Sequence, residues 1–295
     1  MAAAATPVGV VGLGLIGTSL AKRLLAAGFS VHGYDIDAKR AANLGALGGL
    51  PAERARDVGR ACPVVILAVF DTQQVEDVLE GADGIAPQAG QLIICTTTCD
   101  PDPIVALNER LLLQGVRFLE VPLSGNSNQI ALGNGVALVG GERTAMDGVA
   151  PILAAISKQQ FHIGPVGSGG RAKLAVNLVG GLNRAAMAEG LAFAEALGLD
   201  LPAFLEVLKN SAVYSRAMDT RGDKMVRSEF SPHAWLKQSH KDFTLMKTAA
   251  DRVGQELPLA KIYTELIEGC LAHGEGELDN SAIIQEIRRR RKKSQ

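Results

Sequence analysis

The sequence predicts an α/β half followed by an all-helical half. Short apolar runs alternate with helical patterns up to about residue 164, which is typical of a parallel sheet with helices on both faces. Beyond that point only helical patterns occur, and 295 residues suit two domains of about 150 residues each. We therefore expect a doubly wound parallel sheet in residues 1–164 and a helical domain in residues 165–295.

The elements of the first half follow from its apolar runs and helical spacings. Leu20, Leu24 and Leu25 recur at helical intervals, and Gly28 follows them as a natural helix end. The expected strands are 7–12, 29–34, 63–69, 91–95, 116–121 and 135–140. The expected helices are 18–27, 38–47, 71–80 and 102–113.

The second half opens with a glycine-rich turn at 167–170 and then a long helix over 171–197. This segment has no proline and is apolar on nearly every side, so we expect it to be buried within the protein or at a contact between subunits. At 1.5 Å per residue it would be roughly 40 Å long. Further helices are expected at 202–210, 233–253, 258–273 and 280–291.

Charge and composition exclude several classes of protein. The chain has 30 basic and 31 acidic residues, so no overall field attracts a polyanion. One Trp, three Tyr and eight Phe are too few for a surface that stacks nucleic-acid bases. No apolar run reaches the ~18 residues of a membrane span, and residues 1–6 lack the basic start of a signal peptide. We expect a cytoplasmic protein with no nucleic-acid or membrane partner.

Cysteines and histidines indicate neither disulfides nor a metal. The four cysteines lack zinc spacing, so we interpret them as reduced thiols, and the five histidines show no metal-ligand spacing. Cys95 has no histidine positioned by the sequence and is interpreted as a packing residue rather than a nucleophile. The basic run 288–293 follows a helical pattern and is interpreted as a solvated helix end.

A glycine motif after the first strand carries the strongest functional signal. It opens a helix, and an acidic residue ends the second strand, so the context predicts a Rossmann-type dinucleotide site. Gly12 permits the tight turn, Gly14 lets the backbone approach a pyrophosphate, and Gly17 lets helix and strand pack closely. The helix N-terminus adds free N–H groups and partial positive charge. The motif comprises Gly12, Leu13, Gly14, Leu15, Ile16 and Gly17.

Asp35, at the end of the second strand, predicts the choice of cofactor. Its carboxylate can accept hydrogen bonds from both ribose hydroxyls and would repel a 2′-phosphate, and the next residue is Ile36 rather than an arginine. We predict NAD(H) over NADP(H). In the alternative, Asp37 or the pair at 39–40 rearranges to admit the phosphate.

Further motifs follow in a fixed order. Val-Pro-Leu-Ser-Gly occupies 121–125, Gly-Ser-Gly occupies 167–169, Ala-Lys-Leu-Ala-Val-Asn occupies 172–177, and Lys-Asp occupies 241–242. Together with the first motif, this order resembles the β-hydroxyacid dehydrogenase family, which includes 3-hydroxyisobutyrate dehydrogenase and tartronate semialdehyde reductase. The resemblance covers nearly the whole chain. It implies a Rossmann domain, a 6-phosphogluconate dehydrogenase-like helical domain and an active site in the cleft between them.

Lys173 and Asn177 are the expected catalytic pair. When a hydride leaves a carbinol carbon, a proton leaves the hydroxyl, and a lysine beside that hydroxyl can take it. Burial on an apolar helix would lower the pKa of Lys173 toward a useful range. Asn177, four residues on, shares that helix face and can orient the lysine or bind the substrate hydroxyl. The resemblance implies the same pair; the alternative is a lysine whose stem lies along apolar surface.

The resemblance also implies where the substrate binds. Ser124, Gly125 and Asn126 offer a hydroxyl, a flexible backbone and successive N–H groups for a carboxylate. Lys241 is implied to contact both substrate and cofactor. Alternatively, Ser124 caps a turn, and Lys241 is a solvated helix charge.

Two further positions match the Ser-Thr pair of the family after a central strand. Thr96 is placed beside the substrate and Thr97 beside the cofactor. A departure from the family pattern follows Gly125, where Asn126-Ser127-Asn128-Gln129 replaces glycine and small residues. Three amides there predict a more polar pocket and a substrate with extra hydroxyls or a second acid group.

We therefore expect an NAD-dependent oxidoreductase that interconverts a small 3-hydroxy acid and its 3-oxo acid or semialdehyde, with Lys173 as general acid/base. We also expect a homodimer or homotetramer and no metal. Two alternatives stay open. One is an imine reductase, although relatives of that kind usually have another residue in place of Lys173. The other is a catalytically silent cofactor-binding scaffold.

Overall fold

The structure is a computed structural model that describes residues 6–292. The chain divides into two compact units, of which the first ends at Lys173 and the second begins at Leu174. This division lies inside the long helix α9 (Ser168–Ala196), which begins in one unit and continues in the other. Two parts of the sequence interpretation lie outside the described residues: residues 1–5 at the N-terminus and Lys293 of the basic run.

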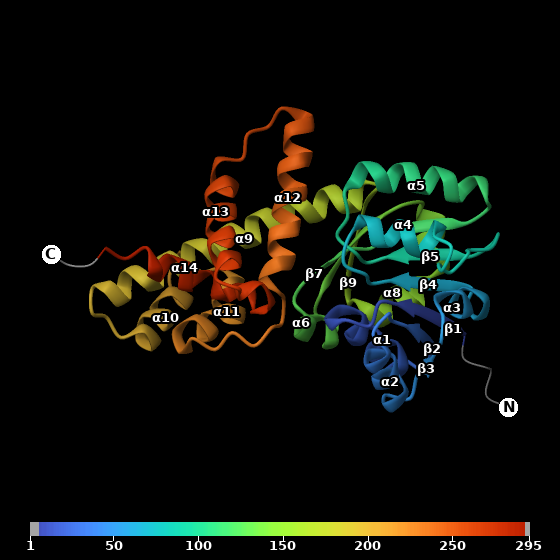
Figure 1. Cartoon of the computed structure of the whole chain (residues 1–295), viewed down its shortest axis with the longest axis horizontal. Coiled ribbons are helices and arrows are strands. Elements are labelled where there is room, and N and C mark those ends of the chain that lie inside the picture. Colours follow the sequence, from blue (N-terminus) through green and yellow to red (C-terminus); the bar gives the residue numbers. More distant parts are fainter. Residues whose placement is uncertain (1–5, 293–295) are drawn as a thin grey trace. The chain divides into compact units, whose positions relative to one another are not determined.

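Within residues 6–292, nine strands of the first unit form one sheet with the order β3-β2-β1-β4-β5-β6-β8-β7, and β9 pairs with β8 (Figure 1). The strands from β1 to β6 are all parallel. Their bounds are β1 Pro7–Val11, β2 Ser30–Tyr34, β3 Leu50–Pro51, β4 Val64–Leu67, β5 Leu92–Cys95, β6 Arg117–Glu120, β7 Leu123–Ser124, β8 Val136–Gly140 and β9 Gln159–Gly164.

The strand β8 departs from the parallel sheet that the sequence predicts. It runs antiparallel to β6 and β7 and parallel to β9. A parallel neighbour requires a crossover of a dozen or more residues, usually a helix across the sheet. Only β7 and the five-residue helix α6 (Ser127–Ala131) separate β6 from β8, so the chain returns beside β7 in the opposite direction.

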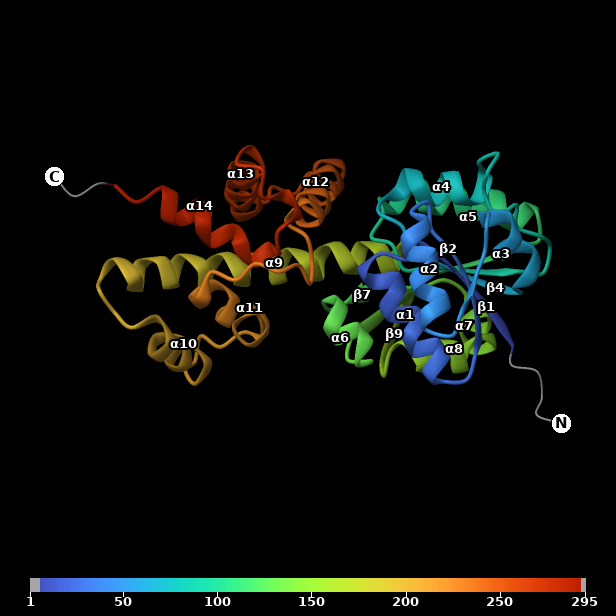
Figure 2. The same cartoon turned by 60° about the horizontal axis from the view of Figure 1, so that its bottom comes forward.

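Helices cover both faces of this sheet, as predicted (Figures 1 and 2). Alternate residues of β4 enter two different cores: Ile66 packs in the cluster with α1 and α8, and Val65 packs in the cluster with α3, α4 and α5. The helices are α1 Leu15–Ala26, α2 Ala38–Ala46, α3 Ala55–Ala61, α4 Thr72–Glu80, α5 Pro101–Leu113, α7 Arg143–Gly148 and α8 Ala150–Ile156.

The regular elements of the second unit are helices in all its described residues. Around α9 lie α10 Leu201–Lys209, α11 Arg216–Arg227, α12 Leu236–Val253, α13 Pro258–Ala272 and α14 Ile283–Arg289, with 3-10 turns at Glu275–Glu277 and Asn280–Ala282. The rings of Phe243 and Tyr263 lie 4.6 Å apart in its core. A side chain at Gly181 of α9 would lie 2.5 Å from the ring of Phe243, so only glycine allows this packing.

A buried ionic cluster fixes the start of α12. Asp279 is fully buried, pairs with Arg221 at 3.2 Å and accepts the backbone N–H of His233 at 2.8 Å. Burial alone would raise the pKa of Asp279, but Arg221 and the hydrogen-bond donors hold it below its ordinary value. The backbone of Asp279 also pairs with that of Trp235 in an isolated antiparallel β-bridge. This cluster therefore anchors the segment that leads into α12.

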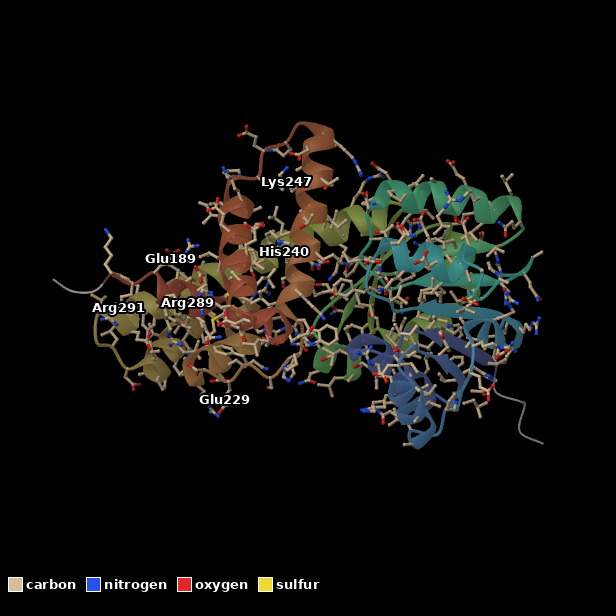
Figure 3. The ribbon with its side chains drawn as sticks, in the orientation of Figure 1. Glu189, Glu229, His240, Lys247, Arg289 and Arg291 are labelled. Atoms are coloured by element: carbon tan, nitrogen blue, oxygen red, sulfur yellow. The ribbon has the colours of Figure 1, made fainter. Side chains whose placement is uncertain are left out.

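The basic C-terminal run is engaged in ion pairs. Arg288 pairs with Glu195 at 2.8 Å, and Arg289 pairs with both Glu275 and Glu286. Figure 3 shows Arg289 among the helices of the second unit, whereas Arg291 lies toward the end of the chain. These pairs give the run a structural role at the end of α14. No helix in residues 6–292 combines the length and hydropathy that a bilayer crossing requires.

Candidate active site

The glycine motif forms the turn between β1 and α1. Gly12 has a φ of +91°, and a side chain there would lie 2.6 Å from the carbonyl oxygen of Ala68. A side chain at Gly17 would overlap the carbonyl oxygen of Gly12 at 1.8 Å. Both positions therefore require glycine for packing within the protein.

Gly14 differs from the other two glycines because space lies open beside it. The nearest atom that a side chain at Gly14 would meet is Nη1 of Arg40, at 3.9 Å. Gly14 is also the N-cap of α1, whose first turn contains no acidic residue and receives no side-chain cap from the described residues. An open backbone surface at an uncapped helix N-terminus fits the pyrophosphate of a dinucleotide.

Asp35 is buried beside this turn. One carboxylate oxygen accepts the N–H of Leu13 at 2.7 Å, and the other accepts the N–H of Asp37 at 2.8 Å. The guanidinium of Arg40 pairs with both acids: Nη1 lies 3.6 Å from Oδ2 of Asp35, and Nε lies 3.6 Å from Oδ2 of Asp37. The carboxylate expected to select NAD and an arginine that could meet a 2′-phosphate are therefore close together.

Thr96 and Thr97 follow β5 and connect it to the end of β4 and to the segment after β4. The hydroxyl of Thr96 donates to the carbonyl of Leu67 at 2.8 Å, and that of Thr97 donates to Val69 at 3.0 Å. Both side chains are buried at the carboxyl ends of parallel strands, where α/β sheets bind ligands. Each hydroxyl can still accept a hydrogen bond.

The segment after Ser124 corrects one sequence expectation. Asn126 caps α6 in a reciprocal capping box: its side chain accepts the N–H of Gln129, and its own N–H donates to the side chain of Gln129, both at 2.9 Å. The N–H of Asn126 is therefore not free for a carboxylate. The side-chain oxygens of Asn126 and Gln129 are both used in this box, and the expectation of a more polar pocket stays a prediction.

Lys173 lies in the second turn of α9 and is 6% exposed. Its Nζ donates to the carbonyl oxygen of Leu123 at 2.8 Å. Leu123 precedes Ser124 in β7, so the first unit brings the expected catalytic lysine to the segment expected to bind the substrate.

Glu120 is a buried acid at this site that the sequence interpretation missed. It ends β6, and its carboxylate accepts the backbone N–H groups of Gly167, Gly169 and Gly170 at the start of α9. Burial raises its pKa to about 7, against the opposing effect of these hydrogen bonds. An acidic residue directly before Val-Pro-Leu-Ser-Gly, at the end of an apolar strand, was the available signal.

The second unit brings Asn177 and Lys241 together through Asp242. The side-chain amide of Asn177 donates to Oδ2 of Asp242 at 2.8 Å, and Nζ of Lys241 lies 3.2 Å from Oδ1 of the same residue. Asp242 is buried on α12 and was recognised in the sequence only as part of a motif.

Other reactive groups do not form a second centre in the described part of the chain. Residues 6–292 contain no group of three or more His, Cys, Asp or Glu side chains that could hold a metal. All four cysteines are buried free thiols, and burial raises the pKa of Cys62 and Cys270 to about 12. Thiols of this kind are poor nucleophiles at neutral pH.

Two protein-family models match the chain. Residues 7–164 match the NAD binding domain of 6-phosphogluconate dehydrogenase. Residues 167–287 match the NAD-binding family of NADP-dependent 3-hydroxyisobutyrate dehydrogenase.

Individual relatives align over nearly the full length. L-Threonate dehydrogenase from Cupriavidus necator is 31% identical over 281 residues, which cover 94% of this chain and 95% of that protein. 2-Hydroxy-3-oxopropionate reductase from Escherichia coli is 30% identical over 281 residues, which cover 95% of this chain and 96% of that protein. The crystal structure of 3-hydroxyisobutyrate dehydrogenase from Salmonella typhimurium superposes with a TM-score of 0.88 at 27% identity, covering 95% and 99%.

Proposed function

The chain belongs to the β-hydroxyacid dehydrogenase family, and from this premise we propose that it interconverts a small 3-hydroxy acid and its 3-oxo acid or semialdehyde. The observation that carries the proposal is the buried amine of Lys173, held 2.8 Å from the backbone next to Ser124. The names of the relatives support the substrate class, since they act on threonate, 2-hydroxy-3-oxopropionate and 3-hydroxyisobutyrate.

Lys173 is the proposed general base in oxidation and general acid in reduction. Its neutral amine takes the proton of the substrate hydroxyl while the C–H bond breaks and the carbonyl forms, and in reduction the ammonium returns that proton. When bound, the nicotinamide supplies the acceptor or donor of the hydride. The hydrogen bond to Leu123 restricts where Nζ can lie, and such restriction favours reaction.

The substrate carboxylate is proposed to bind Ser124 and Gly125. The hydroxyl of Ser124 is a donor, and Gly125 has a φ of +150° that lets the backbone turn beside it. Thr96 is proposed to contact the substrate and Thr97 the cofactor, and Lys241 adds a cation for the acid group or the cofactor. Asn126 is left out of the carboxylate site because its N–H is used in the capping box.

Asn177 is the proposed partner of Lys173, one turn further along the same helix. Its amide donates to Asp242, which fixes the orientation of the side chain and leaves the amide oxygen for the lysine or the substrate hydroxyl. We therefore add Asp242 as a positioning residue for Asn177.

The cofactor is proposed to be NAD rather than NADP. Each oxygen of Asp35 accepts one backbone N–H and has a lone pair left for a ribose hydroxyl. The 2′-phosphate of NADP would lie beside this carboxylate, and the two negative charges would repel each other. Arg40 is the residue through which the chain could accept NADP, but its pairing with Asp35 and Asp37 opposes that.

The protein is further proposed to form a homodimer or homotetramer through α9. Residues of the second unit at alternating spacings of three and four form one largely exposed stripe along this helix and just past its end, the α9 seam. Its larger members are well exposed, with Val179 at 59%, Phe193 at 65% and Leu197 at 61%. The α9 seam comprises Val176, Val179, Asn183, Ala186, Gly190, Phe193 and Leu197. The free thiols suit the proposed cytoplasmic location.

The deciding experiment is an assay of NAD and NADP reduction with three- to six-carbon hydroxy acids, including polyhydroxylated and dicarboxylic ones. A cyclic imine with NADH or NADPH tests imine reduction in parallel. We expect turnover of at least one 3-hydroxy acid, with NAD preferred. Turnover of the imine alone, or dinucleotide binding without any turnover, would favour the two alternatives and refute the proposal.

A further inference from the structure

Glu120 is a buried carboxylate for which the proposed reaction has no use. It is 4% exposed at the end of β6, and its oxygens accept the N–H of Gly167, Gly169 and Gly170. These groups belong to the first turn of α9 and the residue before it. Free N–H groups and partial positive charge at a helix start favour an anion at this place.

The glycines at 169 and 170 are explained by this contact. A side chain at Gly169 would lie 2.8 Å from the carbonyl oxygen of Leu138 and 3.0 Å from the amide of Gly140, both in β8. A side chain at Gly170 would lie 2.9 Å from Oε1 of Glu120. Glycine at these two positions lets the helix start approach both the strand and the carboxylate this closely.

The same short segment also holds the end of the Lys173 side chain. Glu120 binds the start of α9, and three residues later the carbonyl of Leu123 accepts the hydrogen bond from Nζ of Lys173. Lys173 lies three residues after Gly170, so less than one helical turn separates the two attachment points. A displacement of the helix start would therefore move Nζ relative to Leu123 and Ser124.

We infer that Glu120 is a positioning residue for Lys173: its ionised carboxylate anchors the start of α9 and thereby keeps the lysine amine beside the substrate-binding segment. This inference rests on the proposed function, in which Lys173 exchanges the substrate proton. Glu120 itself has no contact with the reacting atoms in this scheme.

One charged side chain that acts on Glu120 comes from the helix itself. In α9, Arg171 favours its ionised form, and that guanidinium pairs with Asp102 of α5 at 3.2 Å. Cys95 is its register partner in β5, and Gly140 is its partner in β8. Burial leaves Glu120 with a pKa of about 7, so the anchor weakens as the pH falls through neutrality.

The first test compares Glu120→Gln with Glu120→Asp and a control. Glu80→Gln is the control, because Glu80 is an acid of α4 that pairs with Arg110 of α5. For Glu120→Gln we expect kcat to fall by about 10- to 100-fold, the size of effect that a misplaced catalytic group produces. We expect an unchanged Kd for NADH, loss of the ionisation near pH 7 from the pH profile of kcat, and partial rescue by Glu120→Asp.

The second test does not require turnover. Lysines of the folded protein are acetylated briefly, and mass spectrometry gives the labelling rate of Lys173 relative to Lys247, whose side chain is exposed on α12 (Figure 3). We expect this ratio to rise several-fold in Glu120→Gln and not in Glu80→Gln. The wild type could show no hydroxy-acid turnover while the labelling ratio still rises in Glu120→Gln. That result would refute the proposed function and support the role of Glu120 in holding Lys173.

A purely structural role predicts a different outcome. Glu120→Gln would then have a lower melting temperature, while the pH profile and the labelling ratio of the folded protein would match the wild type, and this result would overturn the inference. If Glu120→Gln does not fold, Glu120→Asp decides alone. Its shorter side chain must lower kcat and raise the labelling ratio, and wild-type values for both would overturn the inference.

Discussion

The side-chain amide of Asn177 donates a 2.8 Å hydrogen bond to the buried carboxylate of Asp242, whose other oxygen lies 3.2 Å from Nζ of Lys241. One acid thus connects two residues that the sequence singles out, although 65 positions separate Asn177 from Asp242. If this acid positions Asn177, then removing it should impair the reaction without removing any group that touches the substrate.

Asp242→Asn should lower kcat/KM by about tenfold, since a hydrogen bond to a charged partner contributes about 1.5–3 kcal/mol. The Asn177→Ala change should add little to it, because the two residues act as one unit. Steady-state kinetics of both single variants and the double variant check this. Fully additive losses would contradict the positioning role.

Replacing Lys173 should abolish proton exchange and leave cofactor binding intact. For Lys173→Met we expect kcat to fall by about 10²–10⁴-fold, the usual contribution of a general acid or base. The Kd for NADH, measured by fluorescence, should stay within about twofold of the wild type, because a twofold change is under 0.5 kcal/mol. An unchanged kcat would remove Lys173 from the mechanism, and Lys247→Met serves as the control.

Asp35 and Arg40 should have opposite effects on cofactor choice. Asp35→Ala removes the acceptor for the ribose hydroxyls and the repulsion of a 2′-phosphate, so the ratio of kcat/KM for NADP over NAD should rise by more than about tenfold. Arg40→Ala should lower any residual use of NADP. The ratio is measured with both cofactors at fixed substrate, and equal kcat/KM values in the wild type would contradict the NAD preference.

Glu120 should make stability depend on pH. Its pKa is raised from 4.5 to about 7 in the folded protein, so between these values the folded state keeps a proton that the unfolded state has released. The free energy of unfolding should therefore fall as the pH rises from about 4.5 to about 7, by about 3 kcal/mol at most from this group. Glu120→Gln lacks this contribution.

Urea unfolding of the wild type and Glu120→Gln at pH 5 and pH 8 tests this dependence. The wild type should lose stability relative to the variant at the higher pH. A constant difference between the two proteins would show that Glu120 has an ordinary pKa.

The α9 seam should control the oligomeric state. Val179→Glu places a charge within an apolar contact and should convert the oligomer to a monomer in light scattering after size exclusion. Val207→Glu is a matched control, because Val207 is equally exposed, at 60%, but lies on α10. A monomeric wild type, or an oligomer that survives Val179→Glu, would contradict the assignment of this surface.

Several elements escaped the sequence interpretation for physical reasons. Helices α3, α7 and α8 have six or seven residues, too few for a helical period to stand out. The helix α11 is rich in charge, and its buried Arg221 forms its ion pair with Asp279 in a distant turn. The reversed direction of β8 depends on strand pairing, which no local pattern records.

By itself, the sequence determined the features that short-range chemistry specifies. The glycine turn with Asp35, the apolar strands, the long helix and the order of the motifs are all local patterns, and they were sufficient for the fold class and the family. Only the tertiary structure decided which polar groups meet. Glu120 lies 47 positions before Gly167, and Lys173 lies 50 positions after Leu123. Hydrogen bonds between such distant residues form only when packing of the apolar core brings their backbones together, so no local pattern contains them.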